Sequence, residues 1–166
     1  MVDPEQQSLT ERIERTFEQI YRERMAGLPI LNPDLAVKLV GLRAWAGGWV
    51  GVLVTPWMMN LIALPGANGA DRPGAAGSQR GRAFTSGEYQ FTAGADPVIG
   101  RYETCSLFSP MGTFPDQETA VATAESILTL LLDAPPADTA QPAPDHPPQR
   151  TLSRRGLLRA ALGGGA

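Results

Sequence analysis

The chain has 166 residues, of which 43% are hydrophobic and 19% are charged, and its formal net charge is −3. This length provides one domain of ordinary size with a hydrophobic core, together with short tails. The acidic balance argues against nucleic-acid binding, which needs a basic surface facing the phosphates. The single cysteine, Cys105, excludes an internal disulfide and a multi-cysteine metal site, so we expect no resident metal or cofactor.

Targeting and membrane signals are not visible in the sequence. No basic N-terminal segment leads into a short apolar stretch, which is the pattern of a secretory signal. The longest apolar stretch, residues 49–64, is interrupted by Gly51, Pro56 and Asn60 and is too short for a membrane span. We therefore expect a cytoplasmic protein with no integral membrane segment.

The first predicted element is an amphipathic helix that begins at Ser8. Ser8 and Glu11 have the spacing of a capping box, in which each side chain satisfies a free backbone N–H. Ile13 and Phe17 then follow at helical spacing, and Gly27 is expected to end the helix.

Strand patterns follow the first helix. Residues 36–45 and 49–54 flank a Gly47-Gly48 turn, which predicts a hairpin. Residues 58–64 are expected to form a third strand, because Pro56 interrupts the apolar run and introduces a bend.

The second half of the predicted domain contains a long loop, two strands and a helix. Residues 65–81 are rich in Gly, Ala and Pro and predict the loop, and residues 83–93 and 98–108 predict a second strand pair. A helix is expected to open at Asp116 and to stop at Pro135. This order predicts an α+β fold, a two-layer sandwich in which an antiparallel sheet of about five strands carries helices on one face.

A proline-rich segment separates this domain from the C-terminal tail. Residues 134–149 contain six prolines and no aliphatic residue larger than alanine, which predicts a stiff, extended linker. The domain is therefore assigned to residues 1–133 and the basic tail to residues 150–166. The motif Ser153-Arg154-Arg155-Gly156-Leu157-Leu158 resembles the twin-arginine export consensus, but such signals act at the N-terminus. The tail is either a disordered basic end or a functional segment, which would be a short docking helix or a mimic of a partner's signal.

Residues suited to catalysis are scarce. Nucleophilic catalysis needs a positioned base, and the single histidine, His146, lies in the proline-rich linker. No glycine-rich loop has the spacing of a phosphate-binding motif. Glu88, Asp96 and Glu103 are expected to be solvated strand or turn residues. The sequence therefore predicts a protein that is not an enzyme.

Two apolar segments remain to be explained, residues 55–62 and residues 105–111. Short apolar runs of this kind usually form core strands. Their Trp and Met side chains also supply adaptable contact area for another polypeptide. Cys105 has the same two interpretations, a buried small hydrophobe or a thiol offered to a partner, and burial is the default for a free cysteine.

These segments together resemble the [NiFe]-hydrogenase assembly chaperones of the HybE/HupJ family. The likeness rests on residues 55–61, on residues 97–102, on residues 105–111 and on the tail motif, in this order and spacing. Two positions depart from the family pattern: Met58 stands where many relatives have an aromatic residue, and Leu157 replaces the Phe of the tail motif.

The resemblance implies a non-catalytic accessory chaperone for the maturation of a [NiFe] uptake hydrogenase, with a fold related to secretion chaperones. It implies that the chain holds a hydrogenase subunit precursor before export. The small iron–sulfur subunit is favoured, the large subunit is the second candidate, and other maturation proteins are further candidates. The candidate partner-binding residues are Trp57, Met58, Met59, Tyr102, Cys105, Leu107, Phe108, Arg154, Arg155, Leu157 and Leu158.

The alternative function is a generic peptide-binding module of the secretion-chaperone type that serves another client. An enzyme is the least favoured class, because the sequence shows no converging set of polar groups. Peripheral membrane binding through the tail is also weak, since four arginines with few aromatic residues anchor poorly.

Overall fold

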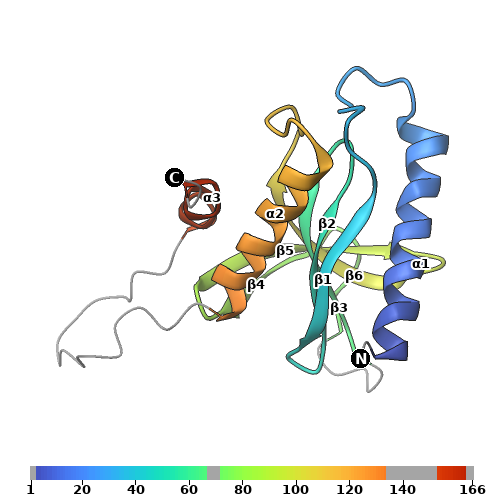
Figure 1. The fold of residues 1–166 in the computed structure, drawn as a ribbon. Coiled ribbons are helices and arrows are strands. Elements are labelled where there is room, and N and C mark those ends of the chain that lie inside the picture. The colour runs from blue at the N-terminus through green and yellow to red at the C-terminus, as the bar shows by residue number, and fades with distance from the viewer. Residues whose placement is uncertain (1–2, 67–71, 134–152, 164–166) are drawn as a thin grey trace.

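The computed structural model describes residues 3–66, 72–133 and 153–163. One antiparallel sheet of six strands forms the centre of the molecule, and helices pack against it (Figure 1). In chain order the elements are α1 (Pro4–Ile20), the π-helical turn η1 (Tyr21–Met25), β1 (Lys38–Trp45), β2 (Gly48–Val54), β3 (Met59–Leu64), β4 (Gln79–Phe84), β5 (Gly87–Asp96), β6 (Gly100–Phe108), α2 (Gln117–Leu128), the π-helical turn η2 (Thr129–Asp133) and α3 (Arg154–Gly163).

The first helix begins earlier than the sequence analysis predicts. Asp3 is the N-cap, its side chain accepts a hydrogen bond from the Glu5 N–H at 2.9 Å, and Pro4 occupies the first helical position. An Asp-Pro start suits a helix because the side chain satisfies a free N–H and proline has none to satisfy. The predicted capping box at Ser8 is therefore wrong, since Ser8 lies inside the helix.

The predicted hairpin is confirmed, but its turn lies one residue earlier than the expected Gly47-Gly48, because Gly48 begins β2. Ala46 and Gly47 form its turn with φ angles of 51° and 79°, and β1 pairs with β2 on either side. Two consecutive residues with positive φ match the twist of the flanking strands, which is why such turns connect tight hairpins. The third strand, β3, also follows the bend at Pro56 as expected.

The sheet has six strands where about five were expected. Its order is β1-β2-β3-β6-β5-β4, with every neighbouring pair antiparallel. The additional strand, β4, arises because a turn at Thr85 and Ser86 divides the region predicted as one strand. The predicted loop over residues 65–81 also ends earlier, since β4 begins at Gln79.

The α+β class is confirmed, but the helices cover both faces of the sheet and not one. Helix α1 packs on the outer face, where Ile13 and Phe17 join a cluster with side chains of β1 to β3. Helix α2 packs on the inner face with a second cluster (Figure 1). Strand β2 is buried almost continuously from Val50 to Val54, and a strand that is apolar on both sides must be covered on both.

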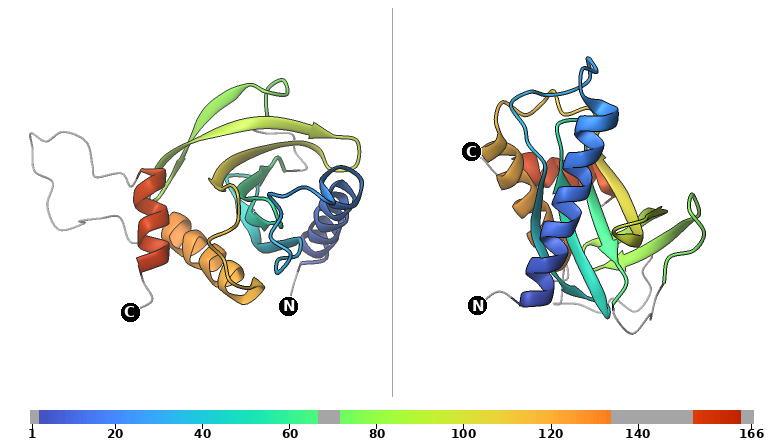
Figure 2. Two further views of the ribbon diagram at one scale, coloured as in Figure 1. Left: turned by 90° about the horizontal axis from the view of Figure 1, so that it is seen from above. Right: turned by 90° about the vertical axis from the view of Figure 1, so that its right-hand side faces the viewer.

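The sheet curves until its two edge strands approach each other. Trp45, at the end of β1, stacks on Phe84, at the end of β4, with ring centroids 4.3 Å apart. Arg82 of β4 also lies over the Trp45 ring. The view from above in Figure 2 shows β4, β5 and β6 arching away from β1 and β2. The inner face is therefore concave, and α2 and α3 lie on its open side.

The last two helices begin as short polar caps predict. The Asp116 side chain accepts a hydrogen bond from the Thr119 N–H at 2.7 Å, which confirms the predicted start of α2. The expected stop at Pro135 lies outside the described residues. In the tail, residues 154–163 form helix α3, so this part is helical. Its role as a docking helix stays a prediction. The division into domain, linker and tail stays a prediction.

Candidate partner-binding surfaces

The described residues contain no cluster of metal-ligating side chains. Within the described ranges, no group of three or more His, Cys, Asp or Glu residues could hold a metal ion. Among those residues, no helix is long and apolar enough to cross a membrane. His146 lies outside the described residues. The candidate functional features of the described residues are therefore surfaces that could contact a partner.

The sheet separates the predicted binding residues onto two faces. Met58 and Tyr102 belong to the outer cluster beside α1, whereas Met59, Cys105 and Leu107 belong to the inner cluster. Successive side chains of a strand point to opposite faces, so Tyr102 and Cys105, an odd number of positions apart on β6, cannot share one surface. Met58 lies in the turn before β3, and Met59 is the first residue of that strand. The structure does not bring the predicted residues together into a single site.

Trp57 is a core residue of the outer face. Its exposed fraction is 9%, and its ring stacks on Tyr21 with a centroid distance of 6.2 Å and an interplanar angle of 3°. The buried Thr55 side chain organises this turn, since its hydroxyl oxygen accepts hydrogen bonds from the N–H groups of Trp57 and Met58. The predicted motif around Trp57 thus has a structural role, and Met58 is the half-buried side chain that it leaves accessible.

An exposed apolar segment lies beside this turn. The Asn32 N–H donates to the Pro56 carbonyl at 2.8 Å, which holds the preceding segment next to the turn. That segment carries Leu28 and Ile30, whose exposed fractions are 42% and 50%. We call Leu28, Ile30 and Met58 the turn surface. The sequence analysis missed Leu28 and Ile30, because they lie in a loop and no periodic pattern marks them.

Asn32 is a further residue that the sequence analysis missed. Its side-chain amide donates to the carbonyls of Met111 and Phe114 at 3.0 and 2.8 Å. These bonds join the loop after α1 to the loop before α2, so Asn32 fixes the position of the turn surface relative to the sheet. The sequence shows only that an asparagine lies in a loop. It does not show the partners of this side chain, because they are about 80 residues away in the chain.

Tyr102 lies half-buried on the outer face of β6. It pairs directly across from Gly94 of β5, and a Cβ on Gly94 would lie 2.8 Å from the Tyr102 ring. The ring therefore covers the glycine, which has no side chain of its own to pack. Burial raises the pKa of Tyr102, and the nearby Asp96 carboxylate raises it further. Tyr102 is thus a neutral aromatic side chain with part of its surface accessible.

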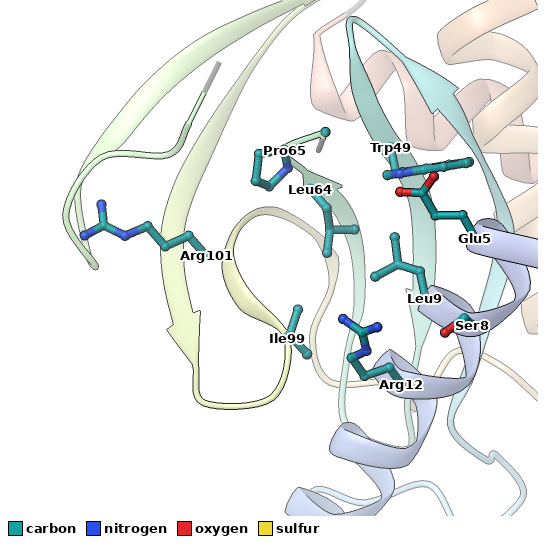
Figure 3. A pocket seen from close by; sticks show the side chains of 10 residues that line it. Glu5, Ser8, Leu9, Arg12, Trp49, Leu64, Pro65, Ile99 and Arg101 are labelled. Carbon is teal, nitrogen blue, oxygen red and sulfur yellow. The ribbon is translucent and has the colours of Figure 1, made fainter. Parts of the chain in front are cut away.

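A small pocket of about 290 Å³ opens on the same outer face, between α1, β2 and the β5–β6 turn (Figure 3). Asp96 accepts hydrogen bonds from the N–H groups of Val98 and Ile99, and this turn carries Ile99 to the pocket. Figure 3 shows Arg101 pointing away from α1, where it donates to the Pro73 carbonyl. The pocket lining is Glu5, Ser8, Leu9, Arg12, Trp49, Leu64, Pro65, Gly66, Ile99 and Arg101.

The inner face holds the cysteine and the tail helix together. Cys105 has an exposed fraction of 3%, which confirms the expected burial. Burial raises the pKa of the Cys105 thiol, and the positive charge of Arg154 partly opposes this. Leu157 of α3 is completely buried in the same cluster, while Arg154 and Arg155 are exposed.

The other inner-face candidates have mixed exposure. Met59 and Leu107 are buried, so their described role is core packing. Phe108 is half-buried and packs edge-on against Phe114 with ring centroids 5.0 Å apart. Leu158 is half-buried at the edge of the inner cluster.

Glu103 corrects a further expectation. It was expected to be solvated, but its exposed fraction is 1% and its carboxylate pairs with Arg80 and Arg82. Strand β4 places both arginines on the concave face, and Arg82 also lies 5.9 Å from the centre of the Phe91 ring. A buried carboxylate needs such partners to offset the loss of hydration. Sequence spacing alone could not show this, because it does not give the curvature of the sheet.

The fold and these surfaces define a small α+β binding protein whose accessible features are apolar side chains and a docked basic helix. A search against family profiles matches residues 8–160 to "[NiFe]-hydrogenase assembly, chaperone, HybE". The chain belongs to this family of assembly chaperones, and the expectation that it is not an enzyme is confirmed by that membership.

Individual relatives agree with this assignment. The chain is 47% identical to the hydrogenase expression/formation protein HupT of Azotobacter chroococcum over 85% of this chain and 88% of HupT. It is 39% identical to HupJ of Bradyrhizobium diazoefficiens over 89% of this chain and 85% of HupJ. The solution structure of HybE from Escherichia coli shares the fold, with a TM-score of 0.62 over 84% of this chain and 86% of that one, at 24% identity.

Proposed function

We propose that the chain is a holding chaperone for a [NiFe]-hydrogenase subunit precursor and acts in the cytoplasm before export. The favoured client is the small iron–sulfur subunit, and the family resemblance implies that the precursor of this subunit carries its own twin-arginine signal. Family membership is the observation that carries this proposal. The relatives named for hydrogenase expression and formation support the same client class.

The turn surface supplies the contact that a holding chaperone needs. Exposed leucine and isoleucine side chains favour transfer out of water, and the thioether of Met58 adapts to irregular apolar partners. Leu28 and Ile30 account for half of the four large hydrophobic side chains that are exposed among the described residues. An apolar surface of this kind can cover an apolar region of a client while cofactors are inserted elsewhere.

Affinity purification from cells that express the hydrogenase operon tests the proposal. The tagged full chain is expected to recover a precursor subunit with its signal attached, identified by mass spectrometry. Recovery of unrelated proteins alone, with hydrogenase present in the lysate, would support the generic peptide-binding module.

Matched variants test the turn surface within the same assay. Ile30→Lys is expected to reduce precursor recovery, because it places a hydrated charge on the contact surface. Val98→Lys is the control, since Val98 is also a β-branched residue with an exposed fraction of 57% but lies at the β5–β6 turn. Equal recovery by both variants would remove the turn surface from the mechanism.

A further inference from the structure

Helix α3 is docked on the domain through a small apolar contact. Leu157 is completely buried in the inner cluster, and Leu158 and Ala161 pack at its edge. The helix lies beside α2 and η2 on the open side of the curved sheet (Figures 1 and 2). Its N-terminus is capped by Ser153, whose hydroxyl accepts a hydrogen bond from the Gly156 N–H. The tail motif is therefore an ordered part of the surface.

The orientation of α3 matches the chemistry of its motif. The leucine that follows the arginine pair points into the protein, while both arginines remain exposed at the start of the helix. Helix α2, on the other side of the contact, carries Glu118 and Glu125 and no basic residue. These exposed carboxylates line a groove of about 800 Å³ between α2 and α3. The α3 side of this groove is formed by Ala160, Ala161 and Leu162, in the second half of the helix. The apolar site that holds Leu157 against the inner cluster, which we call the socket, lies under the first half of the helix.

The contact has the character of one that can open. A ten-residue helix is marginally stable by itself, and only one of its side chains is completely buried. Helix α3 is joined covalently to η2 by the intervening chain, of which residues 134–149 contain six prolines. Tethering replaces a bimolecular event by an intramolecular one, at an effective concentration on the order of millimolar. Docking of α3 therefore depends largely on its tether.

We propose that the socket under α3 binds a partner segment in which two arginines precede two leucines, and that α3 occupies this socket in the free protein. The client's segment displaces α3 and places a leucine where Leu157 packs against the inner cluster. This inference rests on the proposed function, because the twin-arginine signal of a precursor is the partner segment with this chemistry.

A peptide competition experiment tests the socket directly. The probe is a fluorescein-labelled peptide with the sequence of residues 153–163, and its binding to the full chain is measured by anisotropy. Leu157→Asp in the protein prevents its own α3 from competing with the peptide for the socket. We expect the peptide to bind this variant about tenfold more tightly than the wild-type chain. A factor of about ten follows if the effective concentration of α3 at the socket is about ten times the peptide's dissociation constant. Leu162→Asp is the matched control, because Leu162 lies on the same helix with an exposed fraction of 48%.

Two results would overturn the inference. Equal peptide affinity for the wild-type chain and Leu157→Asp would show that α3 does not compete for the site. Absence of binding by a folded Leu157→Asp chain would show that the socket takes no such segment. If circular dichroism shows that Leu157→Asp is unfolded, Leu158→Asp at the half-buried position replaces it with the same expectations. Light scattering gives the oligomeric state of both chains. If the wild-type chain is a dimer and Leu157→Asp is a monomer, α3 docks on a second copy, and the inference that it docks on its own chain is overturned.

Precursor recovery separates this inference from the proposed function. More precursor on Leu157→Asp than on the wild-type chain supports both. Equal recovery on both chains overturns the socket and leaves the proposed function standing. Peptide competition without precursor recovery overturns the proposed client and leaves the socket standing.

Discussion

Replacement of Trp57 by alanine should destabilise the domain strongly. The side chain is 9% exposed and packs in the outer cluster between α1 and the sheet. Truncation of a buried tryptophan to alanine costs about 3–5 kcal/mol. The stack on Tyr21 lies within the range where aromatic pairs contribute about 0.5–1.5 kcal/mol beyond burial. We expect a total loss of about 4 kcal/mol, a large part of the ~5–15 kcal/mol that stabilises an ordinary domain.

Urea unfolding, followed by circular dichroism, measures this loss. Trp57→Phe is the control, since it retains an aromatic ring in the cluster and should lose much less. A double-mutant cycle with Tyr21→Leu isolates the stack and should give a coupling of about 0.5–1.5 kcal/mol. A loss below about 1 kcal/mol in Trp57→Ala would contradict core packing and would restore the view from sequence that Trp57 serves a partner.

Three further predictions concern single side chains. Hydrogen bonds from Thr119 hold the pKa of Asp116 below its ordinary value of 3.8, so its contribution to stability is present above that value and is lost as pH falls through the lower folded pKa. Asp116→Asn keeps an N-cap side chain but has no titrating carboxyl, so its free energy of unfolding should lack this pH dependence. If the variant and the wild-type chain lose stability identically at acid pH, the contribution assigned to the Asp116 carboxylate is refuted. Gly94→Ala should displace the Tyr102 ring and lower the melting temperature by several degrees. Gly112→Ala is the control and should not lower it, because a Cβ at position 112 lies in open space. Equal melting temperatures of the two variants would contradict the contact between Gly94 and the Tyr102 ring. Cys105, whose pKa is raised by burial, should react with a thiol reagent far more slowly in the folded chain than in urea, and equal rates would show an exposed thiol.

The sequence by itself determined the local elements of this protein. The β1–β2 hairpin was predictable because Gly47 permits the positive φ that its turn requires, although the second positive-φ residue is Ala46 and not Gly48. The start of α2 was predictable because an aspartate can satisfy a free N–H three residues ahead. The family resemblance was also visible, since it depends on the order and spacing of short segments and not on their contacts. The expected burial of Cys105 followed from residue type alone.

Only the tertiary structure decided which residues share a surface. Tyr102 and Cys105 lie on opposite faces of β6 because strand side chains alternate, and which face carries which helix depends on packing. Sheet curvature brings Trp45 to Phe84, and the strand order, with β5 between β4 and β6, places Glu103 within reach of Arg80 and Arg82, all across long sequence separations. The docking of Leu157 likewise depends on a socket formed by elements far away in the chain. Such contacts follow from the mutual placement of whole elements, which local propensity and spacing do not specify.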